Sequence, residues 1–257
     1  MLFDTHTHLT DPKLYEDLEG VLERAREAQV LKMNVVGYDW ASSLMSVRLA
    51  EKYPQLLYAT VGVHPYDADS FDEAILNKLA DLATAPQVVA LGEMGLDYYR
   101  DLTSKEDQKR AFLAQIDLAK QLKRPLVIHN RQSHGDILEI LRREKAGENG
   151  GILHCFSGSV EMARECIKLG FEISLAGPVT YNNARILQQV AIETPLEHLL
   201  IETDCPYLSP HPLRGKTNEP ARVSYVAAKI AELKKIDFDE VAEITTKNAL
   251  RVFNLDE

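Results

Sequence analysis

Short apolar runs alternate with longer amphipathic segments from one end of the chain to the other. Apolar runs of about four to eight residues are typical of buried strands, and apolar residues at helical spacing are typical of amphipathic helices. The pattern predicts strands at residues 2–6, 32–36, 57–64, 88–92, 126–129, 151–154, 172–175 and 198–202. It predicts helices in the segments 15–29, 76–85, 105–122, 136–145, 160–169 and 183–193, before a final helical pair that ends near Phe253.

Strict alternation of strands and helices predicts βαβ units and a parallel sheet. The 257 residues would suffice for one barrel or for two small domains. No linker interrupts the alternation, so we expect a single (β/α)₈ barrel of the TIM type over residues 1–257. A doubly wound open sheet is the alternative topology, but a barrel explains better why polar residues follow nearly every predicted strand.

The composition is that of an ordinary globular protein, with 45% hydrophobic and 26% charged residues. The chain begins without the basic and then apolar segments of a signal peptide, and its apolar runs are too short to cross a membrane. We therefore expect a cytoplasmic protein with no membrane association and no obligate protein partner. Its three cysteines form no CxxC pair and are expected to be reduced core residues.

The balance of charge is acidic, because 29 basic residues face 39 acidic ones and give a net charge of −10. Such a charge opposes non-specific attraction to nucleic acid. A polyanionic substrate would therefore have to be held locally, by metal ions and a few basic groups.

Two histidines, His6 and His8, lie one residue apart at the end of the first predicted strand. Side chains alternate faces along a strand, so both imidazoles point the same way, and a barrel strand would aim them at its mouth. This is the geometry of a chelating pair, although an HxH sequence also occurs by chance on surfaces. Asp4 shares their parity, and we expect it to hold an imidazole rather than to bind an ion.

Four more titratable residues come just after apolar runs, where the strands of a barrel end. They are Glu93, His129, His154 and Asp204. Each alone could be an isolated loop residue, but a closed barrel would gather all four with His6 and His8 at its C-terminal face. The segment 206–220, rich in proline, glycine and polar residues, is expected to form a long loop at the same face.

Four imidazoles and two carboxylates exceed what one ion with an open coordination position needs. They suit borderline divalent metals such as zinc, manganese or iron. We therefore expect two divalent ions about 3.5–4 Å apart, joined by a bridging carboxylate and able to activate a water molecule. Zn²⁺, Mn²⁺ and Mg²⁺ are the candidates to test.

The whole chain resembles the TatD-type metal-dependent deoxyribonucleases of the amidohydrolase superfamily. Eight motifs in order carry the resemblance: FDTHTH (3–8), GVHP (62–65), GEMGLDY (92–98), QKRAF (108–112), PLVIHNR (125–131), HCFSG (154–158), ETDCPY (202–207) and RGKTNEP (214–220). The resemblance implies that His6, His8, Glu93 and Asp204 hold one ion. It also implies that Glu93, His129 and His154 hold the other, with Glu93 as the bridge.

The resemblance further implies hydrolysis of phosphodiester bonds, often from the 3′ end of single-stranded DNA. Asp204 and Glu93 are then the expected catalytic carboxylates, with Asp204 orienting the water and accepting its proton. His64, which ends the third predicted strand, would donate to a phosphate or leaving oxygen, unless it is a structural histidine fixed by Pro65. Glu202 is expected to support a ligand, and a structural ion pair is its alternative.

Several basic and aromatic residues near the strand ends are candidates for substrate binding. Arg131, Arg214 and Lys216 could bind phosphates that flank the scissile bond, or could be solvated surface residues. Tyr98, Tyr99 and Tyr207 could stack on bases or merely pack at the rim. We expect single-stranded DNA, or another phosphodiester, as the substrate.

Two other functions fit parts of the pattern. A related hydrolase could act on an amide, a lactone or an aminoacyl ester, because a tetrahedral intermediate needs the same water activation. A non-catalytic binding module with structural metals is the third reading. Structural zinc sites are usually closed and rich in cysteine, however, and no predicted ligand here is a cysteine.

Overall fold

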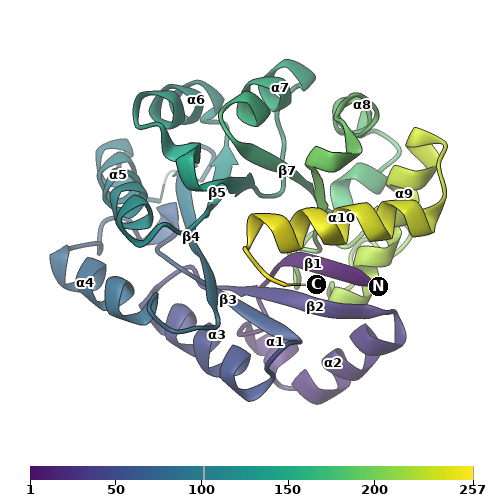
Figure 1. Cartoon of the computed structure of the whole chain (residues 1–257), viewed down its shortest axis with the longest axis horizontal. Helices are drawn as coiled ribbons and strands as arrows, with labels where there is room; N and C mark the ends of the chain where they lie inside the picture. Colours follow the sequence, from purple (N-terminus) through teal and green to yellow (C-terminus); the bar gives the residue numbers. More distant parts are fainter. Residues whose placement is uncertain (101, 257) are drawn as a thin grey trace.

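Eight parallel strands follow one another in chain order around a nearly closed barrel, with the helices outside (Figure 1). This computed structural model describes residues 1–100 and 102–256. The strands are β1 (Leu2–Thr7), β2 (Val30–Val36), β3 (Leu57–Val61), β4 (Val88–Asp97), β5 (Leu126–Arg131), β6 (Gly151–Leu153), β7 (Phe171–Leu175) and β8 (Leu199–Ile201). Each pairs in parallel with its neighbours in the sequence, as βαβ units require.

The first and last strands meet at their carboxyl ends. A parallel bridge joins Thr7 to Cys205, the main-chain N–H of Asp204 donates to the carbonyl of His6 at 3.0 Å, and that of His8 donates to Cys205 at 2.9 Å. The predicted (β/α)₈ barrel is therefore confirmed, and the open doubly wound sheet is wrong. The same contacts set Asp204 beside His6 of β1 and His8, which follows it.

With two additions, the short first helix and the longer third helix, the helices begin and end close to the predicted segments. They are α1 (Pro12–Tyr15), α2 (Leu18–Glu27), α3 (Trp40–Lys52), α4 (Glu73–Leu82), α5 (Lys105–Leu122), α6 (His134–Arg143), α7 (Val160–Lys168), α8 (Arg185–Glu193), α9 (Val223–Lys234) and α10 (Phe238–Val252). The amphipathic pattern gives little sign of α3, because Ser42, Ser43 and Ser46 occupy buried positions on its inner face. Within the described part of the chain, no helix is long and apolar enough to span a bilayer.

One end of the barrel is sealed by the last helix. Leu250 and Phe253 at the end of the chain join an apolar cluster with Phe3 of β1, Val89 of β4 and Val127 of β5. Helix α10 packs against β1 and β8, and Figure 1 shows it crossing the barrel beside β1. The amino ends of the strands are thus covered, which leaves the carboxyl ends as the open face.

Strand β4 is twice as long as predicted and reaches into the open mouth. All ten residues of Val88–Asp97 are buried, and Gly95 has φ +145°. A Cβ atom on Gly95 would lie 2.1 Å from the carbonyl oxygen of His129, so only glycine lets β4 run this close to β5. Glu93 and Asp97 flank Gly95 at two-residue spacing and point to the same face.

Candidate metal centre

The six predicted metal ligands lie in one cluster at the open mouth. β1 supplies His6, β4 supplies Glu93, and β5 supplies His129, while His8, His154 and Asp204 come just after β1, β6 and β8. These strands are far apart in the sequence, and the barrel brings their carboxyl ends together. Their side chains are between 0% and 16% exposed, with His6 at the lower limit and His129 at the upper.

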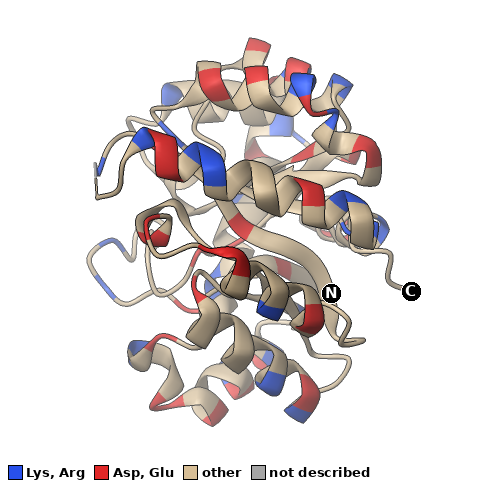
Figure 2. Ribbon diagram, turned by 90° about the vertical axis from the view of Figure 1, so that its left-hand side faces the viewer, with Lys and Arg blue, Asp and Glu red and all other residues tan. Residues whose placement is uncertain are grey.

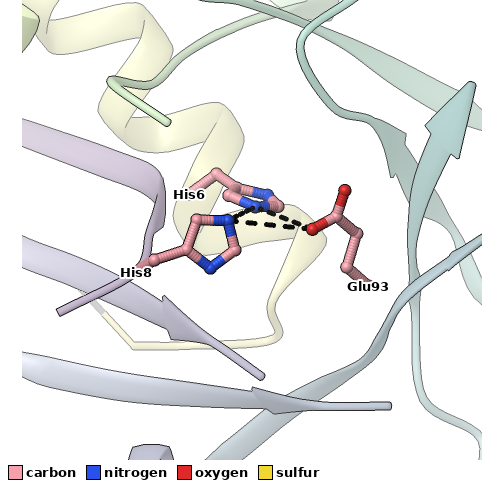
Figure 3. A group of neighbouring side chains, drawn as sticks. All are labelled: His6, His8 and Glu93. Atoms are coloured by element: carbon pink, nitrogen blue, oxygen red, sulfur yellow. Dashed lines mark hydrogen bonds and ion pairs between the residues drawn. The ribbon is translucent and has the colours of Figure 1, made fainter. Parts of the chain in front are cut away.

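In the first group, the inner nitrogens of His6 and His8 lie within 3.8 Å of both Glu93 and Asp204. Nε2 of His6 and Nε2 of His8 are 3.3 Å apart, and they lie 3.5 and 3.8 Å from Oε2 of Glu93 (Figure 3). Oδ1 of Asp204 lies 3.8 Å from His6 and 3.4 Å from His8. Zinc–nitrogen bonds of about 2.0–2.1 Å in a tetrahedral site set ligand atoms about 3.3–3.4 Å apart. The spacing of these atoms therefore suits one divalent ion.

The other oxygen of Glu93 faces a second group. Oε1 lies 2.7 Å from Nε2 of His154 and 2.8 Å from Nδ1 of His129, and these two nitrogens are 3.4 Å apart. One carboxylate thus presents its two oxygens to two separate sets of imidazoles. This is the arrangement of a bridging ligand between two ions.

The outer nitrogens of three imidazoles each face a hydrogen-bond acceptor. Nδ1 of His8 lies 3.0 Å from the carbonyl oxygen of Val36. Nδ1 of His154 lies 3.2 Å from Oε1 of Glu202, and Nε2 of His129 lies 3.0 Å from Oδ2 of Asp97. Each outer nitrogen therefore carries a hydrogen, and the neutral ring directs the lone pair of its inner nitrogen into the cluster.

Lone pairs that face carboxylate oxygens repel them unless a cation lies between. For His129 and His154 this cation is a proton or a metal ion, since both inner nitrogens face Oε1 of Glu93. Burial lowers the pKa of His154, but Glu93 and Glu202 outweigh it and hold the pKa well above that of a free histidine. The cluster therefore attracts positive charge strongly, and its mixture of imidazoles and carboxylates fits divalent metal ions.

The two ligand carboxylates are anionic. Burial would raise the pKa of Glu93, but the charge of His154 and the hydrogen bonds with His129 and His154 outweigh it and hold the pKa well below the usual range. Burial also acts against ionisation of Asp204, whose pKa is nevertheless lowered by the hydrogen bond with His8 and by the nearby His154. Both residues are thus in the protonation state that metal binding requires.

Glu202 lies on the far side of His154 from Glu93. It is fully buried, and its Oε1 also accepts from the main-chain N–H of Cys155 at 2.7 Å. Its Oε2 accepts from the hydroxyl of Ser174 at 2.5 Å. This is the position expected of a residue that orients a ligand, because both of its oxygens are fixed.

Asp4 does not hold an imidazole, contrary to expectation. Its Oδ1 accepts from the main-chain N–H groups of Thr203 at 2.9 Å and His6 at 3.3 Å, and its Oδ2 accepts from the Thr203 hydroxyl at 2.6 Å. Asp4 shares the facing of His6 but lies deeper in the barrel, where the main chain after β8 is its nearest partner. It fastens β1 to the segment that carries Asp204.

Asp97 was not predicted, although it is the partner of His129. Besides that imidazole, its carboxylate accepts from the hydroxyl of Tyr66 at 2.9 Å and from the main-chain N–H groups of Tyr99 and Arg100 at 2.8 and 3.0 Å. The sequence held a signal, because Asp97 has the strand parity of Glu93. The apolar pattern of this strand ends at residue 92, so the sequence alone does not show that the strand, and with it the shared parity, extends to Asp97.

His64 joins the mouth beside Glu93. Its Nδ1 accepts from the main-chain N–H of Tyr66 at 3.1 Å, so the hydrogen of the neutral ring is on Nε2, which lies 3.6 Å from Oε1 of Glu93. Burial, together with the imidazoles of His129 and His154, lowers the pKa of His64 to about 3. His64 is therefore neutral and in this tautomer a hydrogen-bond donor, although His64, Glu93 and His129 also lie close enough together to hold an ion.

The predicted substrate-binding cations lie outside the ligand cluster. The guanidinium of Arg131 stacks over the ring of Tyr99 at 3.9 Å, and that of Arg214 stacks over Tyr181 at 4.3 Å. Lys216 is exposed on the long loop after β8. Figure 2 shows loops bearing Lys and Arg that project on the side opposite to the two chain termini.

The predicted tyrosines differ in their surroundings. The Tyr98 hydroxyl donates to Asp136 at 2.6 Å, which fixes that ring against α6. Tyr99 and Tyr207 are 54% and 49% exposed at the rim, and Arg131 covers one face of Tyr99. The structure therefore favours packing for Tyr98 and leaves a stacking surface on the other two.

The chain is similar to known proteins over nearly its whole length. Residues 3–254 match the family described as TatD related DNase. The "uncharacterized metal-dependent hydrolase YabD" of Bacillus subtilis is 49% identical over 99% of this chain and 100% of its own length. The "3′-5′ ssDNA/RNA exonuclease TatD" of Pectobacterium parmentieri is 34% identical over 99% of this chain and 100% of its own length. The crystal structure of YjjV, a TatD homologue from Escherichia coli K12, superimposes with a TM-score of 0.94 at 33% identity and covers 99% of this chain and 98% of its own.

Proposed function

The chain belongs to the TatD related DNase family and is a metal-dependent hydrolase, and on this premise we propose that it is a deoxyribonuclease. It cleaves phosphodiester bonds of single-stranded DNA from the 3′ end. The exonuclease of Pectobacterium parmentieri supports the direction and the substrate class, because its identity with this chain extends over nearly the full length.

The observation that carries the proposal is the division of the Glu93 carboxylate between two sets of imidazoles. Oε2 faces His6 and His8, while Oε1 faces His129 and His154. We assign two divalent ions to these sets, with Asp204 completing the first. Ions bound there would activate a water molecule for attack on phosphorus and neutralise charge on the phosphate oxygens.

Asp204 is the proton acceptor in this proposal. Its side chain is 14% exposed, whereas those of His6, Glu93 and His8 are 0%, 5% and 8% exposed. It is thus the member of the first group nearest the open mouth, where water enters. It is anionic, so it can accept a hydrogen bond from an attacking water, orient it and then accept its proton.

His64 acts as a hydrogen-bond donor to the substrate. Its Nε2–H points into the mouth near Glu93, and the ring stays neutral at physiological pH because its pKa is about 3. A neutral donor stabilises a phosphate or leaving oxygen without competing with the ions for Glu93. Arg131 follows His129 on β5 and holds a flanking phosphate, which offsets the net charge of −10.

The test is hydrolysis of 5′-labelled and 3′-labelled single-stranded DNA by metal-stripped protein after addition of Mg²⁺, Mn²⁺ or Zn²⁺. We expect stepwise shortening from the 3′ end that requires metal, is lost in Asp204→Asn and persists in Asp81→Asn, a control on the outer helix α4. A nitrophenyl ester and a lactone are assayed in parallel. Metal-dependent turnover of either, with intact DNA under every ion, would replace the nuclease by the esterase or lactonase alternative.

A further inference from the structure

A hollow of about 380 Å³ lies between α1, the turn after β7 and the loop after β8, the loop that begins beside Asp204. It is lined by Lys13, Tyr181, Pro206, Leu208, Ser209, Arg214, Gly215, Lys216 and Thr217. A volume of this size suits a single small organic ligand or one nucleotide unit, rather than a folded partner.

The hollow is positively charged in a chain that is otherwise acidic. Lys13, Arg214 and Lys216 contribute three cations, and none of the described residues that line it is acidic. Two further polar residues, Ser209 and Thr217, also line it. Three cations around one small space, in a chain of net charge −10, point to an anionic ligand.

An aromatic ring forms one wall. The Tyr181 ring carries the guanidinium of Arg214 at 4.3 Å, and planar groups of both kinds can stack on nucleobases. The Tyr181 hydroxyl donates to the carbonyl of Ser209 at 3.0 Å, which ties this wall to the loop. The hollow thus combines positive charge with a flat surface, as a nucleotide requires.

Local hydrogen bonds hold the loop in shape. The Ser209 hydroxyl donates to the carbonyl of Lys216 at 2.5 Å, and the Asn218 side chain donates to that of Thr203 at 2.9 Å. Gly177 after β7 packs so closely that a Cβ atom there would lie 1.9 Å from the carbonyl oxygen of Leu208. A site formed before the ligand arrives loses less entropy on binding.

Tyr207 links the hollow to the ligand cluster. Its ring lies 6.2 Å from that of the ligand His8, and the ammonium of Lys13, which lines the hollow, lies 5.9 Å from its centre. Pro206 in the wall is the second residue after Asp204. A ligand in the hollow would therefore be a near neighbour of a phosphate at the metal centre.

We propose that the hollow binds the nucleotide next to the scissile phosphate, a role that rests on the function proposed above. Lys13, Arg214 and Lys216 hold its phosphate, and its base stacks on the Tyr181–Arg214 pair. The hollow thereby selects a polynucleotide strand over small phosphate diesters, which reach only the metal centre.

The test compares two substrates with the metal-loaded enzyme. Bis(p-nitrophenyl) phosphate occupies the metal centre alone, whereas a short oligothymidylate also reaches the hollow. For Arg214→Ala and Lys216→Ala we expect KM for the oligonucleotide to rise about tenfold, with kcat and KM for the small diester unchanged. Lys52→Ala is the matched control, because Lys52 stacks on Tyr53 at 4.7 Å on the outer helix α3.

Tyr181 tests the stacking separately from the shape of the loop. Tyr181→Leu removes the ring and should weaken binding of the oligonucleotide about tenfold. It should weaken binding of an oligomer with abasic sugars much less, because that oligomer has no bases to stack. Tyr181→Phe keeps the ring and removes the hydroxyl anchor, so it should retain binding. Two results would overturn the proposal. One is an equal loss of oligonucleotide binding in Tyr181→Leu and Tyr181→Phe. The other is an Arg214→Ala or Lys216→Ala variant that loses as much activity on the small diester as on the oligonucleotide.

Binding of a fluorescein-labelled oligothymidylate, followed by anisotropy, separates this proposal from the nuclease itself. If the wild type cleaves no DNA but binds the oligomer, and each cationic variant loses binding with a salt slope reduced by about one, the hollow stands and the nuclease fails. If DNA is cleaved while the variants bind like the wild type, the nuclease stands and the hollow fails. Binding of inorganic phosphate or free thymidylate alone, without the oligomer, would make it a small-anion site and overturn it.

Discussion

Oδ2 of Asp97 lies 3.0 Å from Nε2 of His129, on the side of the ring opposite to Glu93. Burial would raise the pKa of Asp97, but His129, the main chain and Tyr66 outweigh it and lower the pKa, so the carboxylate is anionic. It holds the His129 hydrogen on Nε2 and turns the Nδ1 lone pair toward Glu93. Asp97 therefore decides which nitrogen of His129 is available to an ion.

Removal of this carboxylate should weaken metal binding. We expect Asp97→Ala to lower metal affinity about 10–100-fold, and Asp97→Asn to lower it less because its amide oxygen still accepts from Nε2. Calorimetric titration of the metal-stripped protein measures both. Asp136→Ala is the matched control, since Asp136 also accepts from a tyrosine hydroxyl, that of Tyr98, but lies away from the imidazoles. Equal affinities for Asp97→Ala and Asp136→Ala would rule out the orienting role.

The bridge predicts a change in metal content. Glu93→Gln replaces two anionic oxygens with one neutral oxygen and an amide that cannot bind an ion, so we expect bound metal to fall from two ions to one or fewer. Activity should fall about a hundredfold or more, because water activation needs the pair. Elemental analysis of dialysed protein gives the count. Glu172→Gln, which disturbs the ion pair with His198 elsewhere, should keep both ions.

His64 should affect turnover without affecting the metals. Its Nδ1 accepts from the main chain, which leaves the hydrogen on Nε2, so we expect it to donate to the substrate rather than to bind an ion. We expect His64→Ala to lower kcat about 10²-fold with metal content unchanged. Steady-state kinetics and elemental analysis of the same sample check this, with the partly exposed His198→Ala as control. A loss of metal in His64→Ala would instead make His64 a ligand.

Metal binding should release protons and should strengthen as pH rises. Burial lowers the pKa values of His8, His129 and His154, but carboxylates outweigh it and raise all three above that of a free histidine. The metal-free cluster therefore keeps protons at pH values where a free histidine has lost them, and an ion must displace these protons. Titration calorimetry in buffers of different ionisation enthalpy counts them. Affinity that is independent of pH between about 6 and 8 would contradict this account.

Gly95 should be intolerant of any side chain. Its φ of +145° and the 2.1 Å approach of a Cβ atom to the His129 carbonyl oxygen combine strain with a clash. We expect Gly95→Ala to lower the free energy of unfolding by about 2–3 kcal/mol and to disturb metal binding as β4 and β5 separate. Gly135→Ala in α6 meets no atom within 4 Å and should be neutral or stabilising by up to about 1 kcal/mol. Thermal unfolding distinguishes the two.

The fold followed from periodicity, and the exceptions have physical causes. Apolar runs and amphipathic segments report burial directly, so the alternation of strands and helices was predictable from the chain alone. The hydrophobic pattern does not predict helix α3, because the buried positions Ser42, Ser43 and Ser46 are polar. The predicted strand ends at residue 92 because the glycine and polar residues in 93–97 are typical of a loop. In the structure all five residues are buried in the mouth and belong to β4.

What the sequence determined about the site is the identity and facing of its side chains. A polar residue after an apolar strand must lie at the carboxyl end of that strand, and this placed His6, His8, Glu93, His129, His154 and Asp204 at one face. The partition of these atoms around the two oxygens of Glu93, the pairing of Asp97 with His129 and the hollow beside Tyr207 depend on distances between strands. Only the closed barrel decided them, because sequence spacing fixes direction along one strand and gives no measure of the gap across the mouth.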